Sequence, residues 1–395
     1  MDAILASEES AATLAPISIT FSPSGLFLVS ATIKNGKFGL CVWDLASCSL
    51  AISAELEDAV LKGVSTLCWH GSLVYVIFTG GKLVAFNPQT GKFETQSQIQ
   101  GVVDQDDIIS TQQTDGMMGH ILVATRRGQI LRIQLLSMTT DTLRAASLND
   151  CDYSCAVFDH KGTLGILAPI RGNLTLFDIT SSTDHGLDLG SLSLGTSPSI
   201  HQMVLHPRNT SLLLVLRDKT VRLVSLDRPN GSISDGVFLS PVHKFQDVVN
   251  RWNWTLAGFS HDGELVWATF YSVGQHLVYI WDTNSGALVK MIEGPKEDLF
   301  LAAWDPKKPT LITASVFGRL FRWIPEYPVK WSALVPGLEE IDDNVEYIER
   351  EDEFDFDVMQ EAARQTLIAP SNGEVTVDIL GDCPVPVEKV FMKAC

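Results

Sequence analysis

The sequence has no long apolar run, since no stretch reaches the 18 residues that a membrane-spanning helix needs. Residues 1–9 contain three acids and no base, so the positive segment of a secretory signal is missing. Only seven cysteines occur, and this odd, scattered set predicts no disulfide framework and favours a reducing compartment. No long amphipathic helix is indicated before Val358. These absences argue against a membrane, secreted or helical protein.

Motifs for catalysis, nucleotide binding or metal binding are also missing. None of the nine His lies in an H-E-x-x-H motif, and Cys151 and Cys155 lack a second pair at zinc spacing. There is no P-loop and no G-x-S-x-G, and the glycine-rich residues 79–82 indicate a hairpin turn. Carboxylates crowd residues 339–357, but a flexible run lacks the rigid, desolvated geometry of catalytic acids and bases. We predict no enzyme activity, no cofactor and no metal.

What the chain does have is length and apolar content. Its 395 residues are 45% apolar and 19% charged, enough for two domains or one large all-β domain. The formal net charge is −18, and residues 339–357 hold 11 acids against one base. The remainder has 36 acids and 28 bases, which is no global nucleic-acid footprint but permits a local basic edge.

One pattern recurs along the chain. An apolar residue leads into a short turn, an apolar strand follows, and a further strand ends in an aromatic and often an Asp. Clear copies run from Phe21 to Asp44 and from Phe259 to Asp282. The strand that closes each copy ends near residues 43, 86, 133, 177, 224, 281 and 323, at intervals of 42 to 57 residues. This spacing is typical of four-stranded blades, so we predict an all-β, seven-bladed β-propeller over residues 1–325.

The pattern leaves the closing strand and some local features open. Either residues 1–15 or the segment after Trp323 could complete the last blade, and we expect the N-terminus because Pro325 and Pro328 interrupt the other candidate. The stretch 228–236 is a predicted surface insertion. Trp252 and Trp254, beside Arg251, are interpreted as buried residues of a strand and loop at the start of a blade; a partner-binding patch is the alternative.

The C-terminal acidic run contains apolar side chains, at Tyr347, Ile348, Phe354 and Phe356. A solvated tail gains nothing from aromatics in water, so we favour a segment that becomes ordered on a partner. Its carboxylates would pair with Arg or Lys clusters in a salt-sensitive contact. We therefore expect an extended acidic C-terminal tail with a linker at 326–343, a partner-binding motif at 344–357 and a further segment at 358–395, which starts briefly helical.

Two resemblances follow from these residues. The aromatic-Asp strand ends and the Ser-Pro-Ser-Gly turn resemble WD40 repeats, although Gly119-His120 is out of phase and most Asp-His-Ser/Thr-Trp networks are expected to be absent. Residues 245–357 resemble the retinoblastoma-binding-protein-five family, the WD40 subunit of COMPASS (Set/MLL) histone H3 lysine-4 methyltransferase complexes. The matching blocks, in order, are FQDVVNR (245–251), FSHDGE (259–264), YIWD (279–282), LVKMIEGPKEDL (288–299), AAWDPKKP (302–309), WSALVPGLEE (331–340) and NVEYIEREDEFD (344–355).

The resemblance implies four sets of binding residues. The SET-domain contacts would be Trp331, Ser332, Ala333, Leu334, Leu338 and Glu340. The SPRY-domain subunit would bind Glu346, Tyr347, Glu349, Arg350, Glu351, Glu353, Phe354 and Asp355. A second WD40 propeller would take Glu374, Val375, Val377 and Asp382, with an ordinary extended tail as the alternative. Nucleosomal DNA would meet Lys219, Arg251 and Lys296, which are otherwise ordinary surface bases; Gly274 replaces a further base of the family pattern.

The function that these resemblances imply is that of a non-catalytic, nuclear scaffold. It would activate a histone H3 lysine-4 methyltransferase complex by bridging the SET subunit and the SPRY subunit through the C-terminal tail. The alternative is a peptide-reading WD40 adaptor, either a substrate receptor or a reader of histone marks through the central channel. The two differ in whether binding survives in the propeller alone. A hydrolytic propeller enzyme is a third interpretation, but no site for it is found.

Overall fold

The computed structural model describes residues 16–34, 37–57, 63–100, 102, 108–113, 119–135, 137–144, 152–170, 172–179, 187–192, 199–227, 238–247, 249–326 and 391–394. The chain divides into two compact units, one of Met1–Glu326 with Phe391–Cys395 and one of Tyr327–Val390. The second unit lies outside the described residues, as does the predicted insertion at 228–236. Within the described residues, no helix is long and apolar enough to cross a membrane.

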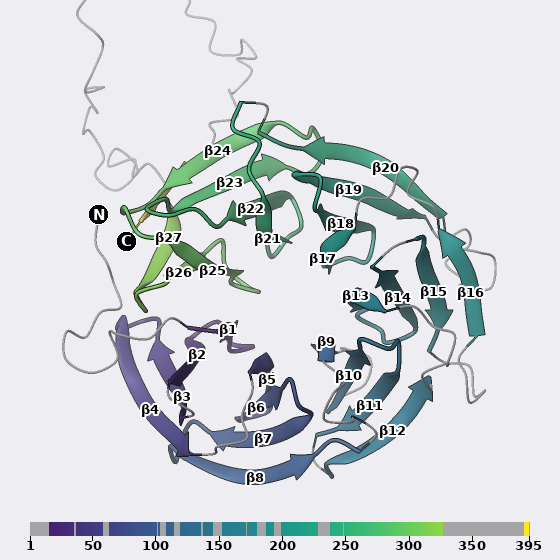
Figure 1. The fold of residues 1–395 in the computed structure, drawn as a ribbon. Coiled ribbons are helices and arrows are strands. Elements are labelled where there is room, and N and C mark those ends of the chain that lie inside the picture. Colours follow the sequence, from purple (N-terminus) through teal and green to yellow (C-terminus); the bar gives the residue numbers. More distant parts are fainter. Residues whose placement is uncertain are drawn as a thin grey trace, which may run out of the picture. The chain divides into compact units, whose positions relative to one another are not determined.

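The first unit is a ring of seven four-stranded antiparallel sheets (Figure 1). We call the strands of each blade a, b, c and d in chain order, which runs from the centre of the ring outward. The bounds are, for blade 1, β1 (Ser18–Phe21), β2 (Phe27–Lys34), β3 (Lys37–Asp44) and β4 (Ser49–Glu57); for blade 2, β5 (Val64–His70), β6 (Leu73–Phe78), β7 (Lys82–Asn87) and β8 (Lys92–Gln98); for blade 3, β9 (Ile108–Gln113), β10 (His120–Thr125), β11 (Ile130–Gln134) and β12 (Thr139–Arg144); for blade 4, β13 (Tyr153–Phe158), β14 (Leu164–Pro169), β15 (Leu174–Asp178) and β16 (Leu187–Leu192); for blade 5, β17 (Ile200–Leu205), β18 (Ser211–Leu216), β19 (Thr220–Asp227) and β20 (Phe238–Phe245); for blade 6, β21 (Trp254–Phe259), β22 (Leu265–Phe270), β23 (Leu277–Asp282) and β24 (Leu288–Glu293); for blade 7, β25 (Leu299–Trp304), β26 (Leu311–Ser315), β27 (Leu320–Glu326) and β28 (Phe391–Ala394).

The prediction of a seven-bladed propeller is confirmed. Each of the seven predicted strand ends falls in a c strand, from Trp43 in β3 to Trp323 in β27. Because strands alternate in direction, the ring has two loop faces. The b–c turns and the blade-to-blade connections lie on one face, here the bc face, and the a–b and c–d turns lie on the other, here the ab face.

The repeated a–b turn explains why the sequence pattern is visible. In blade 1 the backbone N–H of Ser22 donates to the Phe27 carbonyl at 2.8 Å, and the Ser22 hydroxyl accepts from the Phe27 N–H at 3.0 Å. Ser260 makes the same pair of bonds with Leu265 in blade 6. Gly263, at φ +80°, completes the blade 6 turn, and a Cβ there would lie 2.0 Å from the His206 ring. The turn thus selects a short polar residue and, in blade 6, a glycine.

The hydrophobic core consists of one cluster between each pair of neighbouring blades. For example, Val29 and Phe38 of blade 1 pack with Val76 and Phe78 of blade 2. A further cluster joins blade 7 to blade 1, so apolar packing continues around the whole ring. The Arg322 guanidinium, on β27, adds a 2.8 Å hydrogen bond to the Leu45 carbonyl across this last junction.

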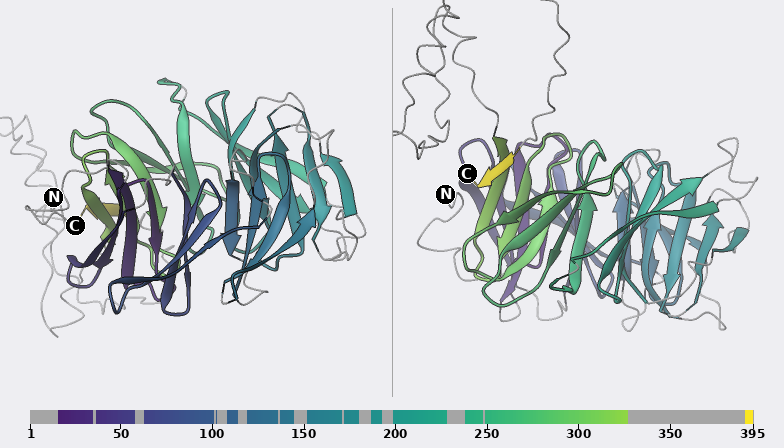
Figure 2. Two further views of the ribbon diagram at one scale, coloured as in Figure 1. Left: turned by 60° about the horizontal axis from the view of Figure 1, so that its bottom comes forward. Right: turned by 90° about the horizontal axis from the view of Figure 1, so that it is seen from above.

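The expected N-terminal closing strand is wrong. The d strand of blade 7 is β28, which pairs with β27 from Glu326↔Phe391 to Trp323↔Ala394; it is the yellow strand in Figure 2. The first described strand, β1, is instead the innermost strand of blade 1. Pro325 does not prevent closure: it lies opposite Met392 in the ladder between β27 and β28, beyond Trp323, which is the last residue of β27 to pair with β26.

Within the described residues, blades 1 and 7 retain part of a Ser/Thr–Trp network, and the sequence led us to expect such networks to be mostly absent. The Trp43 indole donates to the Ser30 hydroxyl at 3.0 Å. In blade 7 the Trp323 indole donates to the Thr313 hydroxyl at 2.9 Å, and that hydroxyl lies 2.7 Å from Nε2 of His276 in the preceding blade. His276 is buried, and desolvation lowers its pKa to about 4.

Acid should destabilise the propeller through His276. The unfolded chain takes up a proton near pH 6.5, whereas the folded chain does so only near pH 4. The stabilising contribution is therefore complete above pH 6.5 and is lost as the pH falls toward 4, by about 2 kcal/mol between pH 7 and pH 5. Urea unfolding at both pH values should show a drop that is smaller by this amount in His276→Gln. An equal drop in both proteins would contradict the assignment.

Candidate functional site

Three of the four predicted sets of binding residues lie in the unit Tyr327–Val390, outside the described residues. These are the SET-contacting segment from Trp331 to Glu340, the SPRY-binding residues from Glu346 to Asp355, and the docking motif from Glu374 to Asp382. All three stay predictions. The fourth set, Lys219, Arg251 and Lys296, lies in described loops of the propeller.

The structure brings these three bases to the bc face. Lys219 lies in the b–c turn between β18 and β19, Arg251 in the connection from β20 to β21, and Lys296 in the connection from β24 to β25. These loops belong to blades 5, 6 and 7, which follow one another around the ring (Figure 1). All three side chains are exposed, and among the described residues none has an ion-pair partner.

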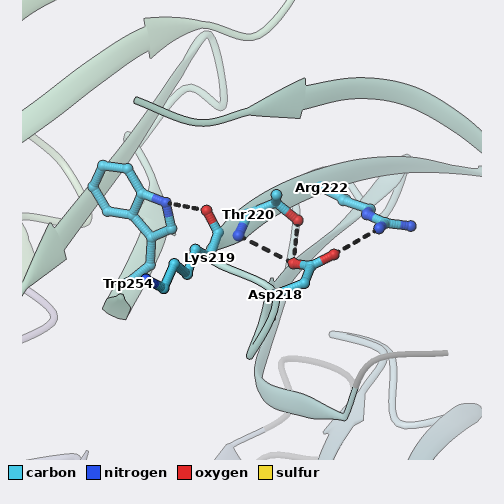
Figure 3. A network of polar contacts seen from close by, with 5 residues as sticks. All are labelled: Asp218, Lys219, Thr220, Arg222 and Trp254. Atoms are coloured by element: carbon cyan, nitrogen blue, oxygen red, sulfur yellow. Dashed lines mark hydrogen bonds and ion pairs between the residues drawn. The ribbon is translucent and has the colours of Figure 1, made fainter. Parts of the chain in front are cut away.

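The turn that carries Lys219 is held on both sides (Figure 3). Asp218 accepts the Thr220 backbone N–H at 3.1 Å and pairs with the Arg222 guanidinium at 2.8 Å. From the next blade, the Trp254 indole donates to the Lys219 carbonyl at 3.1 Å. Lys219 itself has φ +66°. The nearby carboxylate is thus paired within the turn, and the Lys219 ammonium is presented from a fixed backbone.

Arg251 follows a turn organised by Asp247. The Asp247 carboxylate accepts the Val249 and Asn250 backbone N–H groups at 2.8 and 3.0 Å, and the Tyr279 hydroxyl at 2.8 Å. Desolvation raises the pKa of Asp247, but these hydrogen bonds outweigh it and lower that pKa to about 2. The Asp247 carboxylate therefore stays ionised and is engaged by hydrogen bonds within its own turn. Arg251, at φ +49°, is exposed to solvent close to it in the chain.

Acidic neighbours of Lys296 are occupied as well. Glu297 pairs with the Arg319 guanidinium. Asp298 accepts the Tyr271 hydroxyl at 3.2 Å and the Gly274 backbone N–H. Gly274 lies at the exposed tip of the b–c turn of blade 6, so the family's additional base has no counterpart at that position.

Sequence reasoning missed a set of exposed apolar side chains on the same face. Val249 is 88% exposed, Val273 81%, Phe317 59% and Tyr271 51%. They occupy the b–c turns of blades 6 and 7 and the connection before blade 6. No signal in the sequence singled them out, because they come from loops of different blades and gather on one face only when the ring is assembled.

The interpretation of Trp252 and Trp254 as internal residues is confirmed. Trp254 is only 4% exposed. Trp252 stacks on Phe270 with ring centroids 4.2 Å apart, and its indole donates to the Tyr279 hydroxyl at 3.1 Å. Both side chains therefore pack inside the propeller, next to the loop that carries Arg251.

The bc face combines three exposed cations with four exposed apolar side chains. Exposed cations on backbone that is fixed by hydrogen bonds suit phosphate groups, and the exposed apolar side chains suit a protein surface. No group of three or more metal-ligating side chains occurs among the residues that the structure describes.

Comparison with known proteins identifies relatives of similar organisation. No protein-family model matches the chain. It is 40% identical over 163 residues to the Set1 complex component swd1 of Schizosaccharomyces pombe, which covers 41% of this chain and 39% of the relative. It is 34% identical over 225 residues to protein RBL of Arabidopsis thaliana (51% and 40%) and 30% identical over 227 residues to the retinoblastoma-binding protein 5 homolog of Drosophila melanogaster (57% and 45%).

The matched region spans less than half the length of each of these relatives. Among solved structures, the β-propeller domain of Myceliophteria thermophila Cps50 (Swd1) superposes with a TM-score of 0.65 at 23% identity. That match covers 79% of this chain and 96% of the domain, and it supports the same propeller fold.

Proposed function

The chain belongs to the Swd1/retinoblastoma-binding-protein-5 family of WD40 propellers, and from that premise we propose that it is a nuclear, non-catalytic subunit of a histone H3 lysine-4 methyltransferase complex. In this proposal it activates the complex by bridging the SET subunit and the SPRY-domain subunit. The observation that carries the proposal is the order of two sequence blocks, 331–340 and 344–355, after a propeller of this kind.

The proposed mechanism is ordering of one segment by two partners. Residues 331–340 contact the SET domain and residues 344–355 contact the SPRY subunit, while 374–382 docks on a second propeller. Binding restricts the motion of the SET domain and raises the fraction that is in its active conformation. The aromatic residues Tyr347 and Phe354 supply buried anchors, and the carboxylates around them supply charge complementarity.

Reconstitution tests the proposal directly. Lysine-4 methylation by a SET–SPRY pair is measured with the whole chain and with a chain that lacks residues 331–357 but keeps residues 391–395, so that ring closure is preserved. The whole chain should stimulate methylation about tenfold or more, a typical coupling between sites, and the deletion should not. A scrambled 331–357 segment of the same composition is the control. Equal stimulation by the deleted chain would overturn the proposal.

Charge reversal tests the acidic contact separately. The triple variant Glu349→Lys, Glu351→Lys, Glu353→Lys should weaken binding to the SPRY subunit about tenfold at low salt, since charged pairs flank the anchors. Reversal of three exposed propeller acids, Glu55, Glu264 and Glu293, changes the net charge equally and should leave binding unchanged. Titration calorimetry at two salt concentrations reads both. Equal affinity of the two triple variants would count against the contact.

The three bases of the bc face are proposed to contact nucleosomal DNA. Replacing Lys219, Arg251 and Lys296 by Gln should weaken nucleosome binding and reduce the slope of log affinity against log salt by about 2 to 3. Lys161, Lys307 and Lys308 are three exposed bases on the ab face, and their replacement is the matched control. An identical salt slope in both variants would show that the bc face makes no phosphate contact.

A peptide-reading adaptor stays the second candidate, because two uncharged cavities open near the ab face. The two functions separate in a chain that lacks residues 331–357. An adaptor keeps its partner when only the propeller remains, whereas the proposed scaffold loses it.

A further inference from the structure

Four exposed apolar side chains lie in loops of the bc face at blades 6 and 7 (Figure 1). They are Val249 (88% exposed), Val273 (81%), Phe317 (59%) and Tyr271 (51%), and we call them the bc patch. The first comes from the connection between β20 and β21, and the others come from the b–c turns of blades 6 and 7. Proteins that expose several large apolar side chains in one region commonly bind a partner there.

Hydrogen bonds tie the loops of blades 6 and 7 to one another. The Tyr271 hydroxyl donates to the Asp298 carboxylate at 3.2 Å, and the Gly274 backbone N–H donates to the same carboxylate. The Asp298 carbonyl accepts the Val316 backbone N–H, from the b–c turn of blade 7, at 3.0 Å. Both b–c turns are therefore held against the connection that carries Lys296.

The loop that carries Val249 is attached to blade 6 as well. Asp247 accepts the Val249 backbone N–H and the Tyr279 hydroxyl of β23, both at 2.8 Å. Further along this loop, Trp252 stacks on Phe270, the last residue of β22, with ring centroids 4.2 Å apart. Val249 thus lies on backbone that is fixed before a partner binds, which lowers the entropy cost of binding.

Two cations lie in the same loops as the bc patch. Arg251 follows Val249 in its loop, Lys296 lies between β24 and β25, and neither has an ion-pair partner among the residues that the structure describes. The nearest carboxylates in the chain, Asp247 and Glu297, are engaged by donors within these loops. The charge that these loops offer to a partner is therefore positive, although the whole chain carries −18.

We propose that the bc patch, together with Arg251 and Lys296, is the docking surface for an acidic protein segment that carries aliphatic or aromatic side chains between its carboxylates. The carboxylates pair with the two cations, and the apolar side chains pack among those of the bc patch. Charge complementarity identifies the partner, because a basic segment would be repelled and an uncharged one would cover both cations without pairing them. The inference goes beyond the proposed function and does not depend on residues 331–357.

DNA alone does not account for this surface. Phosphates are bound by cations, polar side chains and backbone N–H groups, so a phosphate contact would leave the bc patch unused. Because Arg251 and Lys296 are shared with the proposed nucleosomal contact, DNA and the acidic segment should compete. An anionic membrane is a further ligand with both charge and apolar groups, and vesicles of phosphatidylcholine and phosphatidylserine test it.

Fluorescence anisotropy of a labelled peptide, titrated with the whole chain, tests the proposal. In the probe peptide, Asp and Glu alternate with Leu and Phe. One control peptide has Ser in place of Leu and Phe, and the other has Asn and Gln in place of Asp and Glu. The probe should bind saturably, about tenfold more tightly than either control, and binding should weaken with salt. An affinity no higher than that of either control would overturn the proposal.

Two pairs of substitutions locate the contact. Val273→Ser with Phe317→Ser should weaken binding of the probe about tenfold and leave DNA binding unchanged. The matched control is Leu288→Ser with Met291→Ser, at residues 51% and 47% exposed on the outer strand β24 of blade 6, and it should bind the probe normally. All four side chains are exposed, so these changes should be compatible with folding. Equal affinities of the two double variants would contradict the assignment to the bc patch.

Competition separates this proposal from the nucleosomal contact. Double-stranded DNA should displace the probe, and DNA that binds the chain without displacing it would refute the shared use of Arg251 and Lys296. If DNA does not bind the unmodified chain but the probe does, the DNA contact fails and the acidic partner stands. Vesicle binding that is lost in Val273→Ser with Phe317→Ser, without any binding of the probe, would assign the surface to a membrane instead.

Discussion

Removing residues 391–395 should lower the free energy of unfolding of the propeller by about 3–4 kcal/mol. These residues contain β28, which supplies the whole d strand of blade 7 and pairs four residues with β27. Each ladder hydrogen bond contributes about 1 kcal/mol, and the loss also exposes the edge of β27. Urea unfolding of the shortened and complete chains measures the difference. The shortened chain should also aggregate more readily through the uncovered edge.

Two controls separate closure from mere shortening. Cys395→Ser changes the last residue without touching the ladder and should leave stability unchanged. Deleting residues 340–357 removes more chain but retains β28, and it should cost the propeller little. An unchanged unfolding free energy after removal of 391–395 would mean that blade 7 is stable with three strands. The expected loss of stability makes a propeller cut at residue 325 a poor reagent for binding studies.

Alanine at Gly165 should destabilise the propeller by about 3 kcal/mol. Gly165, on β14, lies between Phe158 of β13 and Phe177 of β15 in the sheet of blade 4. A Cβ at this position would lie 1.9 Å from the Phe177 ring, which is itself buried. The backbone at Gly165 has no positive φ, so the whole effect comes from overpacking of a rigid aromatic ring.

Gly80→Ala is the matched control for this change. A Cβ at Gly80 has nothing within 4 Å, and that residue also has no positive φ, so stability should change by less than about 0.5 kcal/mol. Adding Phe177→Leu to Gly165→Ala should recover part of the loss, because the shorter side chain vacates the space. Unfolding of Gly165→Ala at the same denaturant concentration as Gly80→Ala would contradict the close packing of the Phe177 ring against Gly165.

The repeat could be predicted because each copy carries the same kinds of residue at its turns and strand ends. Five of the seven c strands end near an aromatic, such as Trp43 or Trp281, and a–b turns of the kind that begins at Ser22 and Ser260 recur with them at intervals of 42 to 57 residues. The closing strand could not be predicted in this way. Residues 391–394 are too few to show alternation, and their partner β27 is remote in sequence. Pro325 was taken as a barrier to pairing, yet it lies opposite Met392 in the ladder between β27 and β28.

The grouping of residues on the bc face and the buried Trp323–Thr313–His276 network could not be predicted from the sequence, because their members are distant along the chain. Lys219, Arg251 and Lys296 came from family resemblance, whereas Val273 and Phe317 emerge as neighbours on the same face only when the turns are placed. The Gly-His signature was sought as adjacent residues, yet the histidine that reaches the Thr313 hydroxyl of blade 7 is His276 of blade 6, whose Nε2 lies 2.7 Å from it. A pattern search along the chain cannot find a pair that meets only in space.

Because β27 and β28 pair in blade 7, the covalent connection between them, residues 327–390, begins and ends in the same blade. A partner that binds between residues 327 and 390, as proposed, would therefore bind a segment whose two ends are both held in blade 7. A single proteolytic cut within residues 327–390 would not release the strand directly, but β28 would then stay by pairing alone. After such a cut, β28 could dissociate from blade 7 and rebind reversibly, and a partner bound to the segment that carries β28 could leave together with it.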